Sequence, residues 1–447
     1  MNSLPLSGEK HPNLGDALAR HLGSDALRLV QHIAEEAEGQ GLRSYLVGGI
    51  VRDLLLGRES LDIDLVLEGA AIPFARDLCN KYGGNLEQHK RFGTAKWLLD
   101  PDRLKQELGI EGDGLPGHVD LISAREERYP RAGDLPRVEF EDIRADTQRR
   151  DFTINTLALR LDGARWGELL DFWGGVEDLR EGRLRLLHKR SFRDDATRLL
   201  RLFRFKHRFR FELEAQTESL VVAGLPYLAG ISGERLRHEL DLILGEKQAL
   251  AILKDLDQRG VLNAISPVLG LNSAAEQALD GAMGGSLGDE WKLEGLPQVW
   301  LTLCAWLVNL EGEEDEISEL PKRLALEREL ARATVKTRAA LAGVSNWSTL
   351  KDSQIAAALD AVPALGLAVL FFSLEGEAQS SVAQYVERWR DIQPRSNGED
   401  LKALGLAEGP AYAQILERLR AAWVDGELQT QAEERALLER LVRGAKS

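Results

Sequence analysis

The sequence predicts an α+β fold, in which a head with a small mixed β-sheet is followed by an all-α remainder. Two observations predict it. Short, β-prone apolar runs alternate with helical segments up to about Leu187, and nearly every periodic segment after Phe192 has helical spacing. The 447 residues are enough for about three or four domains.

The expected strands are short runs of alternating or continuous apolar residues, and they fall at 44–48, 62–67, 84–90, 93–99 and 118–124. Helices are expected between them at 27–38, 50–56 and 72–82. After the head, apolar residues recur at helical spacing in 199–211, 235–244, 248–256, 298–308, 320–341 and 411–423. Segments rich in Gly, Pro and Ser separate these helices.

A glycine pair and a carboxylate pair near the start of the chain carry the most information about function. Gly48 and Gly49 join an apolar strand to a helix, so backbone N–H groups can approach a phosphate there. Asp62 and Asp64 are separated by one apolar residue, so on a strand both carboxylates point to one face. Alone, such a pair is typical of the wet face of an edge strand. Together with the glycines, it predicts a nucleotidyltransferase.

This chemistry requires divalent cations, and carboxylates with substrate phosphates are the ligands that Mg²⁺ prefers. Two Mg²⁺ ions roughly 3.5–4 Å apart activate an attacking hydroxyl and neutralise the leaving pyrophosphate. We therefore expect Asp62 and Asp64 to be catalytic metal ligands. Asp120 alternates with apolar neighbours on a strand that could lie beside them. It is a third catalytic candidate, and the alternative is a simple edge-strand acid.

A dense polar cluster at 149–155 precedes another apolar run. Arg150 can donate hydrogen bonds to phosphate oxygens. Asp151 and Asn155 can bond ribose hydroxyls and so help to select a ribonucleotide.

A basic segment at 183–210 contains eleven Lys and Arg residues against two acids, although the whole chain carries a net charge of −15. It places Asp195, Arg198, Arg201 and Arg204 three residues apart, which on a helix makes one charged stripe. A carboxylate beside a guanidinium complements the Watson–Crick edges of cytosine and adenine. The carboxylate would repel the carbonyl oxygens of guanine and uracil. The alternative is an amphipathic helix with a solvated arginine face.

The sequence resembles class II tRNA nucleotidyltransferases and bacterial poly(A) polymerases, of the DNA polymerase β superfamily. The resemblance rests on GGxVRD, DIDLV, VDLISAR, RRDFTIN, DFWGGVEDLREGRLR, SFRDDATRLLRLFRF and ISGERLRHEL, in this order. It implies that Asp62 and Asp64 bind metal and that Asp195 with Arg198 acts as a protein template for CTP and ATP. It also implies nucleotide binding by Gly48, Gly49, Arg52, Arg150, Arg201 and Arg204. The family's Glu-Asp-Pro is Asp194-Asp195-Ala196 here.

The resemblance also implies an architecture of four parts. These are a catalytic nucleotidyltransferase head at 1–187, a neck with the nucleotide-selecting helix at 188–245, a body at 246–345 and a tRNA-binding tail at 346–447. The helical parts would grip the acceptor arm of tRNA by shape and phosphate contacts.

The expected function is Mg²⁺-dependent addition of CMP and AMP to the 3′ end of tRNA, from CTP and ATP, with release of pyrophosphate. The alternatives are an A-only tRNA nucleotidyltransferase, then a poly(A) polymerase, and, in a different class, a non-catalytic RNA-binding protein. The most apolar stretch, at 364–372, is too short to span a membrane. Cys79 and Cys304 have no paired spacing, as expected in a reduced, cytoplasmic protein. No protein partner is expected.

The polar segment at 125–148, with Gly133 and two prolines, is expected to be a mobile loop. In the resembled family, such a loop accompanies the ability to add the terminal A. Arg125, Glu126 and Glu127 are candidates for contact with the nucleotide pocket, and a solvated loop is the alternative.

Overall fold

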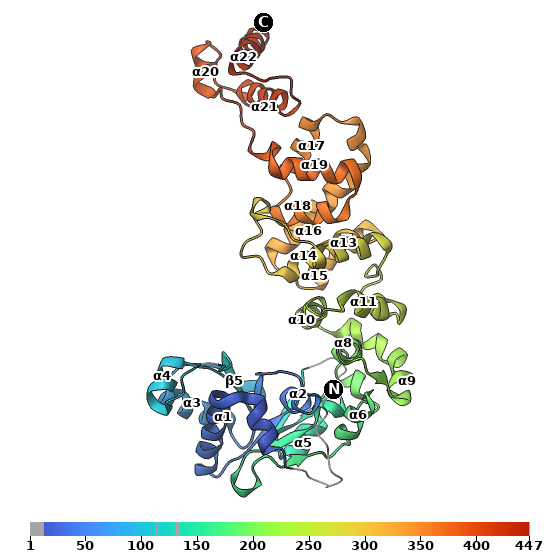
Figure 1. Cartoon of the computed structure of the whole chain (residues 1–447). Helices are drawn as coiled ribbons and strands as arrows, with labels where there is room; N and C mark the ends of the chain where they lie inside the picture. Colours follow the sequence, from blue (N-terminus) through green and yellow to red (C-terminus); the bar gives the residue numbers. More distant parts are fainter. Residues whose placement is uncertain (1–12, 113, 131–134, 447) are drawn as a thin grey trace. The chain divides into compact units, whose positions relative to one another are not determined.

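The computed structural model describes residues 13–112, 114–130 and 135–446, and the chain divides into two compact units at Ile231 (Figure 1). The first unit holds every strand of the described residues, and the second is built from helices. This confirms the predicted α+β head with a mostly helical remainder.

The first unit is built on a seven-stranded sheet with the order β3-β4-β5-β2-β1-β8-β9. Only β2 and β5 pair in parallel, so the sheet is mixed, as predicted. The five expected strands are all present. The strands are β1 (Arg43–Val47), β2 (Ile63–Glu68), β3 (Asn85–His89), β4 (Thr94–Leu98), β5 (His118–Ser123), β8 (Ala158–Arg160) and β9 (Leu169–Leu170).

The two faces of the central strands differ because successive side chains alternate between them. On one face, α3 packs against β3, β4 and β5, and its Ala71 N–H donates to Ser123 Oγ. On the other face, a cluster of buried apolar side chains covers one end of the strands, and Ile143 of α5 belongs to it. The carboxylates Asp64 and Asp120 share this second face, beyond the apolar cluster.

The helices of the first unit include the three that the sequence predicted, although α1 begins earlier than expected. They are α1 (Gly15–Gly39), α2 (Gly49–Leu56), α3 (Ala71–Tyr82), α4 (Pro101–Leu108), α5 (Ile143–Gln148), α6 (Gly175–Glu181), α7 (Ser191–Asp194), α8 (Thr197–Phe209) and α9 (Ala215–Gly224). A parallel pair, β10 (Arg183–Leu184) with β11 (Glu212–Leu213), lies outside the main sheet.

The segment at 125–148 is more ordered than a mobile loop. It contains an antiparallel hairpin of β6 (Arg125–Arg128) and β7 (Arg137–Phe140), followed by α5, while residues 131–134 lie outside the described part. Arg125 and Glu127 form an ion pair with side chains about nine-tenths buried. The expectation of a loop was wrong for these parts, because paired charges at alternate positions look polar in sequence although they are buried together.

The second unit consists of α10 (Gly233–Leu244), α11 (Ala249–Gln258), α12 (Val261–Ile265), α13 (Ser273–Gly284), α14 (Gln298–Val308), α15 (Glu314–Arg323), α16 (Arg328–Gly343), α17 (Asp352–Leu359), α18 (Ala364–Ser373), α19 (Gly376–Glu387), α20 (Gly398–Ala403), α21 (Pro410–Val424) and α22 (Gln431–Lys446). The single helix expected at 320–341 is wrong. The chain breaks between α15 and α16, where Ala325 has a φ of 48°. Within the described residues, none of the helices has the length and apolar character needed to cross a membrane.

Candidate active site

Strand pairing brings the predicted carboxylates together. In the parallel ladder of β2 and β5, Ile63 pairs with Val119 and Asp64 pairs with Asp120. Asp62 directly precedes β2, so the same register carries it toward His118. One ligand atom each from Asp62, His118 and Asp120 lie within 4.8 Å of one another. The four side chains therefore share one face, and His118 is a member that the sequence analysis did not identify.

The site brings several negative charges together, with Asp62 exposed and Asp64 and Asp120 half-buried. Burial, reinforced by the charge of Asp62, raises the pKa of Asp64 to about 7, although Arg150 opposes the shift. Burial also raises the pKa of Asp120, against the positive charges of Lys96 and His118. A divalent cation would relieve this repulsion. Three carboxylates on one face fit Mg²⁺ in their donor chemistry.

The glycine turn shapes the neighbouring edge of the site. Gly48 has a φ of 79°, and a Cβ there would lie 2.7 Å from Nη1 of Arg150. This position therefore requires glycine both for its backbone and for the close approach of Arg150. The N–H of Gly48 is already used, since it donates to the carbonyl oxygen of Leu157 at 3.1 Å. The first-turn amides of α2, which have no acceptor within the helix, are the groups left to face an anion.

Arg52 and Asn155 bind each other rather than standing open to a ligand. Arg52 Nη1 donates to Asn155 Oδ1 at 2.6 Å, and Nε and Nη2 donate to Asp53. The guanidinium also lies 4.7 Å from the ring centroid of Phe209 on α8. Arg52 therefore holds α2 against the 149–155 segment and α8. These bonds use three of the five N–H groups of the guanidinium, and contact of the other two with phosphate remains a prediction.

A buried acid holds the two arginines of the 149–155 segment. Asp146 is fully buried, and its carboxylate accepts from Arg149 Nη2 at 2.7 Å and from Arg150 Nη2 at 3.0 Å. Arg149 also donates to Glu127 of the hairpin at 3.1 Å. Burial raises the pKa of Asp146, but the two guanidinium groups outweigh it and hold the pKa below its ordinary value. Their spacing of three and four residues was the available sequence signal for this contact.

The basic segment is not one continuous helix from Asp195. α7 ends at Asp194 and α8 begins at Thr197, so the predicted stripe is wrong at its first member. Asp195 lies in an extended conformation between them, and its Oδ1 accepts from the Thr197 N–H at 3.0 Å. This local bond to the first residue of α8 competes with a helical conformation at Asp195, as is typical of aspartate.

The arginines of α8 contact the 149–155 segment directly. Arg198 donates to Ser191 Oγ and to the carbonyl oxygen of Arg149, both at 2.6 Å. Arg201 forms an ion pair with Asp151 at 2.7 Å. Burial raises the pKa of Asp151, but Arg201 and other partners outweigh it and lower the pKa to about 2. Arg204 is buried, with its guanidinium 4.9 Å from the ring centroid of Phe205.

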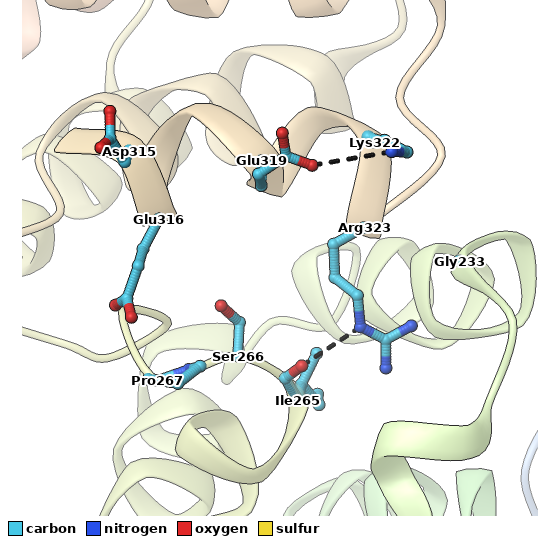
Figure 2. A pocket seen from close by; sticks show the side chains of 9 residues that line it. All are labelled: Gly233, Ile265, Ser266, Pro267, Asp315, Glu316, Glu319, Lys322 and Arg323. Atoms are coloured by element: carbon cyan, nitrogen blue, oxygen red, sulfur yellow. Dashed lines mark hydrogen bonds and ion pairs between the residues drawn. The ribbon is translucent and has the colours of Figure 1, made fainter. Parts of the chain in front are cut away.

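A separate pocket of about 680 Å³ lies within the second unit (Figure 2). Arg323 reaches the carbonyl oxygen of Ile265 at one side, and the other charged side chains are mainly acidic. These acids do not suit the phosphates of a nucleotide or RNA. The lining residues are Gly233, Ile265, Ser266, Pro267, Asp315, Glu316, Glu319, Lys322 and Arg323.

Comparisons with known proteins agree with this geometry. Residues 44–185 match the poly A polymerase head domain, and residues 210–270 match a probable RNA- and SrmB-binding site of polymerase A. An A-adding tRNA nucleotidyltransferase of Halalkalibacterium halodurans is 32% identical over 90% of each chain. One of Geobacter sulfurreducens is 32% identical over 95% of this chain, which spans only 48% of that protein. A solved CCA-adding enzyme in its apo form has a TM-score of 0.78 at 29% identity, covering 98% of this chain and 100% of that one.

Proposed function

The chain belongs to the class II tRNA nucleotidyltransferase family, and from this premise we propose that it adds nucleotides to the 3′ end of tRNA. The observation that supports the proposal most is the register that sets Asp64 beside Asp120 and carries Asp62 toward His118. We also propose a cytoplasmic location, where tRNA and nucleoside triphosphates are both available.

In the proposed reaction, the terminal ribose hydroxyl of tRNA attacks the α-phosphorus of a nucleoside triphosphate. A phosphodiester bond forms, the bond between the α- and β-phosphates breaks, and pyrophosphate leaves. Asp62 and Asp64, with Asp120, would hold Mg²⁺, which when bound activates the hydroxyl and neutralises the leaving group. Arg150, anchored by Asp146 at 3.0 Å, would donate to the phosphates.

Base selection would fall to Asp195 and Arg198. Each terminal nitrogen of a guanidinium carries two N–H groups. Arg198 uses Nη1 for Ser191 and Nη2 for the Arg149 carbonyl, so a further N–H on each nitrogen remains to meet a base. These two bonds also fix the orientation of the guanidinium, which is what a template made of protein requires.

The second unit would grip the acceptor arm of tRNA. We retain the proposed limits of head, neck, body and tail at 1–187, 188–245, 246–345 and 346–447. A helical surface recognises an RNA duplex chiefly by shape and by contacts to phosphates and 2′-hydroxyls.

Full CCA addition is the proposed activity. It is supported by the solved CCA-adding enzyme, whose structure aligns with nearly the whole chain. A-only addition is the second candidate. It is favoured by a specific observation, since two relatives that share 32% identity over nine-tenths or more of this chain are A-adding enzymes. Both candidate activities add the final AMP.

The test uses purified protein with tRNA transcripts that end before CCA, after C and after CC, and each labelled nucleoside triphosphate in turn. Full CCA addition predicts CMP on the two shorter ends and AMP on the end in CC. Extension of the last substrate alone would establish the A-only form. Repeated AMP addition to unrelated RNA would indicate a poly(A) polymerase, and no Mg²⁺-dependent incorporation at all would contradict the proposed transferase.

A further inference from the structure

We propose that His118 gives the catalytic site a nitrogen ligand, so that one metal position, formed with Asp62 and Asp120, prefers a first-row transition ion to Mg²⁺. This inference deepens the proposed function and rests on it for the role of the metal. It concerns the choice of ion, which the carboxylates alone do not determine.

The ladder places the imidazole at the site. His118 and Asp120 are two residues apart on β5, so both side chains lie on the carboxylate face. His118 Nε2 lies 3.6 Å from Asp120 Oδ2, a separation that leaves room for one ion between ligand atoms that each bind at about 2.0–2.2 Å. About a third of the His118 side chain is exposed to solvent, so an ion can enter.

The types of ligand atom decide which ion a metal position prefers. A site of carboxylates and phosphates suits Mg²⁺, a hard cation that takes oxygen ligands. An imidazole nitrogen favours ions such as Co²⁺, Ni²⁺ and Zn²⁺. Asp62, His118 and Asp120 supply three protein ligands and leave further coordination positions open, as in catalytic metal sites. Asp64 does not belong to this group of three, and its carboxylate faces the charges of Asp62, Asp120 and Arg150.

The chain offers a matched control in a second histidine near the site. His89, at the end of β3, pairs with Thr94 of β4, and Lys96, two residues further along β4, pairs with Asp120, so His89 lies on the same face of the sheet as this carboxylate. Only His118 has a ring nitrogen within the group of candidate ligands. Replacing His89 therefore tests the effect of losing an imidazole nearby without losing a ligand.

The experiment measures Co²⁺ and Mg²⁺ binding to the full chain by calorimetry, without tRNA or nucleotide, at about pH 8, where an ordinary imidazole is neutral. Wild type should bind Co²⁺ more tightly than Mg²⁺. His118→Asn keeps an oxygen donor in place of the nitrogen. It should lower Co²⁺ affinity by at least about tenfold and leave Mg²⁺ affinity unchanged. A tenfold loss is typical even when the residue removed only hydrogen-bonds to a metal ligand. His89→Asn should change neither.

A second readout is the visible absorption of bound Co²⁺, which should change in His118→Asn and persist in His89→Asn. Co²⁺ binding unaffected by His118→Asn would overturn the inference. An equal loss of affinity for both ions would also overturn it, because His118 would then only position the carboxylates. A protein that binds Co²⁺ through His118 but transfers no nucleotide would contradict the proposed function alone.

Discussion

Asp146 should be one of the most costly side chains to alter in the first unit. In Asp146→Asn, an amide of the same shape replaces a fully buried carboxylate. One oxygen of that carboxylate accepts two bonds from Arg149, and the other accepts from Arg150. The new amide would place its own N–H donors against a guanidinium, and both arginines would lose their shared counter-charge.

The size of the effect follows from burial. Removing one partner of a buried ion pair costs about 3–5 kcal/mol, because an uncompensated charge stays behind. The side chains of Arg149 and Arg150 are only 14% and 15% exposed. Arg149 keeps Glu127 as a partner at 3.1 Å. We therefore expect a loss near the lower limit, about 3 kcal/mol.

Native-state hydrogen exchange of the β5 amides measures the opening of the first unit without a contribution from the second. The matched control is Glu126→Gln, in the same hairpin as Glu127. Glu126 pairs with Arg128 at 3.0 Å, but both side chains are exposed, so the loss should stay below about 1 kcal/mol. An Asp146→Asn protein as stable as this control would refute the reasoning. The variant should also raise the KM for ATP, because Arg150 would no longer be anchored beside Gly48.

Four further results are expected. Asp64→Ala should abolish nucleotide incorporation while a gel-shift assay still shows tRNA binding, because the carboxylate serves chemistry rather than docking; substantial residual transfer would contradict the metal site. Asp195→Ala should relax discrimination against UTP and GTP by roughly 1–3 kcal/mol in single-nucleotide incorporation, and an unchanged preference would exclude a template role. Gly48→Ala should cost about 1–3 kcal/mol of stability from its left-handed backbone and raise the KM for ATP by displacing Arg150; a variant with wild-type melting temperature and KM would show that neither constraint matters. Because the pKa of Asp151 is about 2 in the folded protein and about 3.9 in an unfolded chain, its pairing with Arg201 stabilises the fold above about pH 4 and is lost as the pH falls toward 2. The stability difference between wild type and Asp151→Asn should therefore shrink from about pH 6 to about pH 3, and a constant difference would argue against the ion pair.

Much of the first unit could be predicted from the sequence because its elements have local causes. The alternation of Asp62 and Asp64 with apolar neighbours predicts a strand, whatever lies beside it. A glycine that needs a φ of 79°, like Gly48, is recognisable between a strand and a helix. The predicted neighbourhood of Asp120 and Asp64 also proved correct, since β2 and β5 are paired.

The missed contacts depend on which strands are neighbours and on which charges are buried. His118 became a candidate ligand only through the register that carries Asp62 toward it. Glu127 looked like a loop acid until the hairpin placed it against Arg149. The break before Thr197 was hidden because helical spacing continues through Asp195 in the sequence.

The sequence by itself determined the positions of the main strands, the glycine turn and the types of residue that carry the chemistry. The tertiary structure decided how these residues are combined. Asp146 illustrates the reason, because a carboxylate next to arginines in sequence can be either a solvated pair of small value or a buried anchor worth several kcal/mol. The difference lies in the removal of water by distant parts of the chain, and local sequence does not encode it.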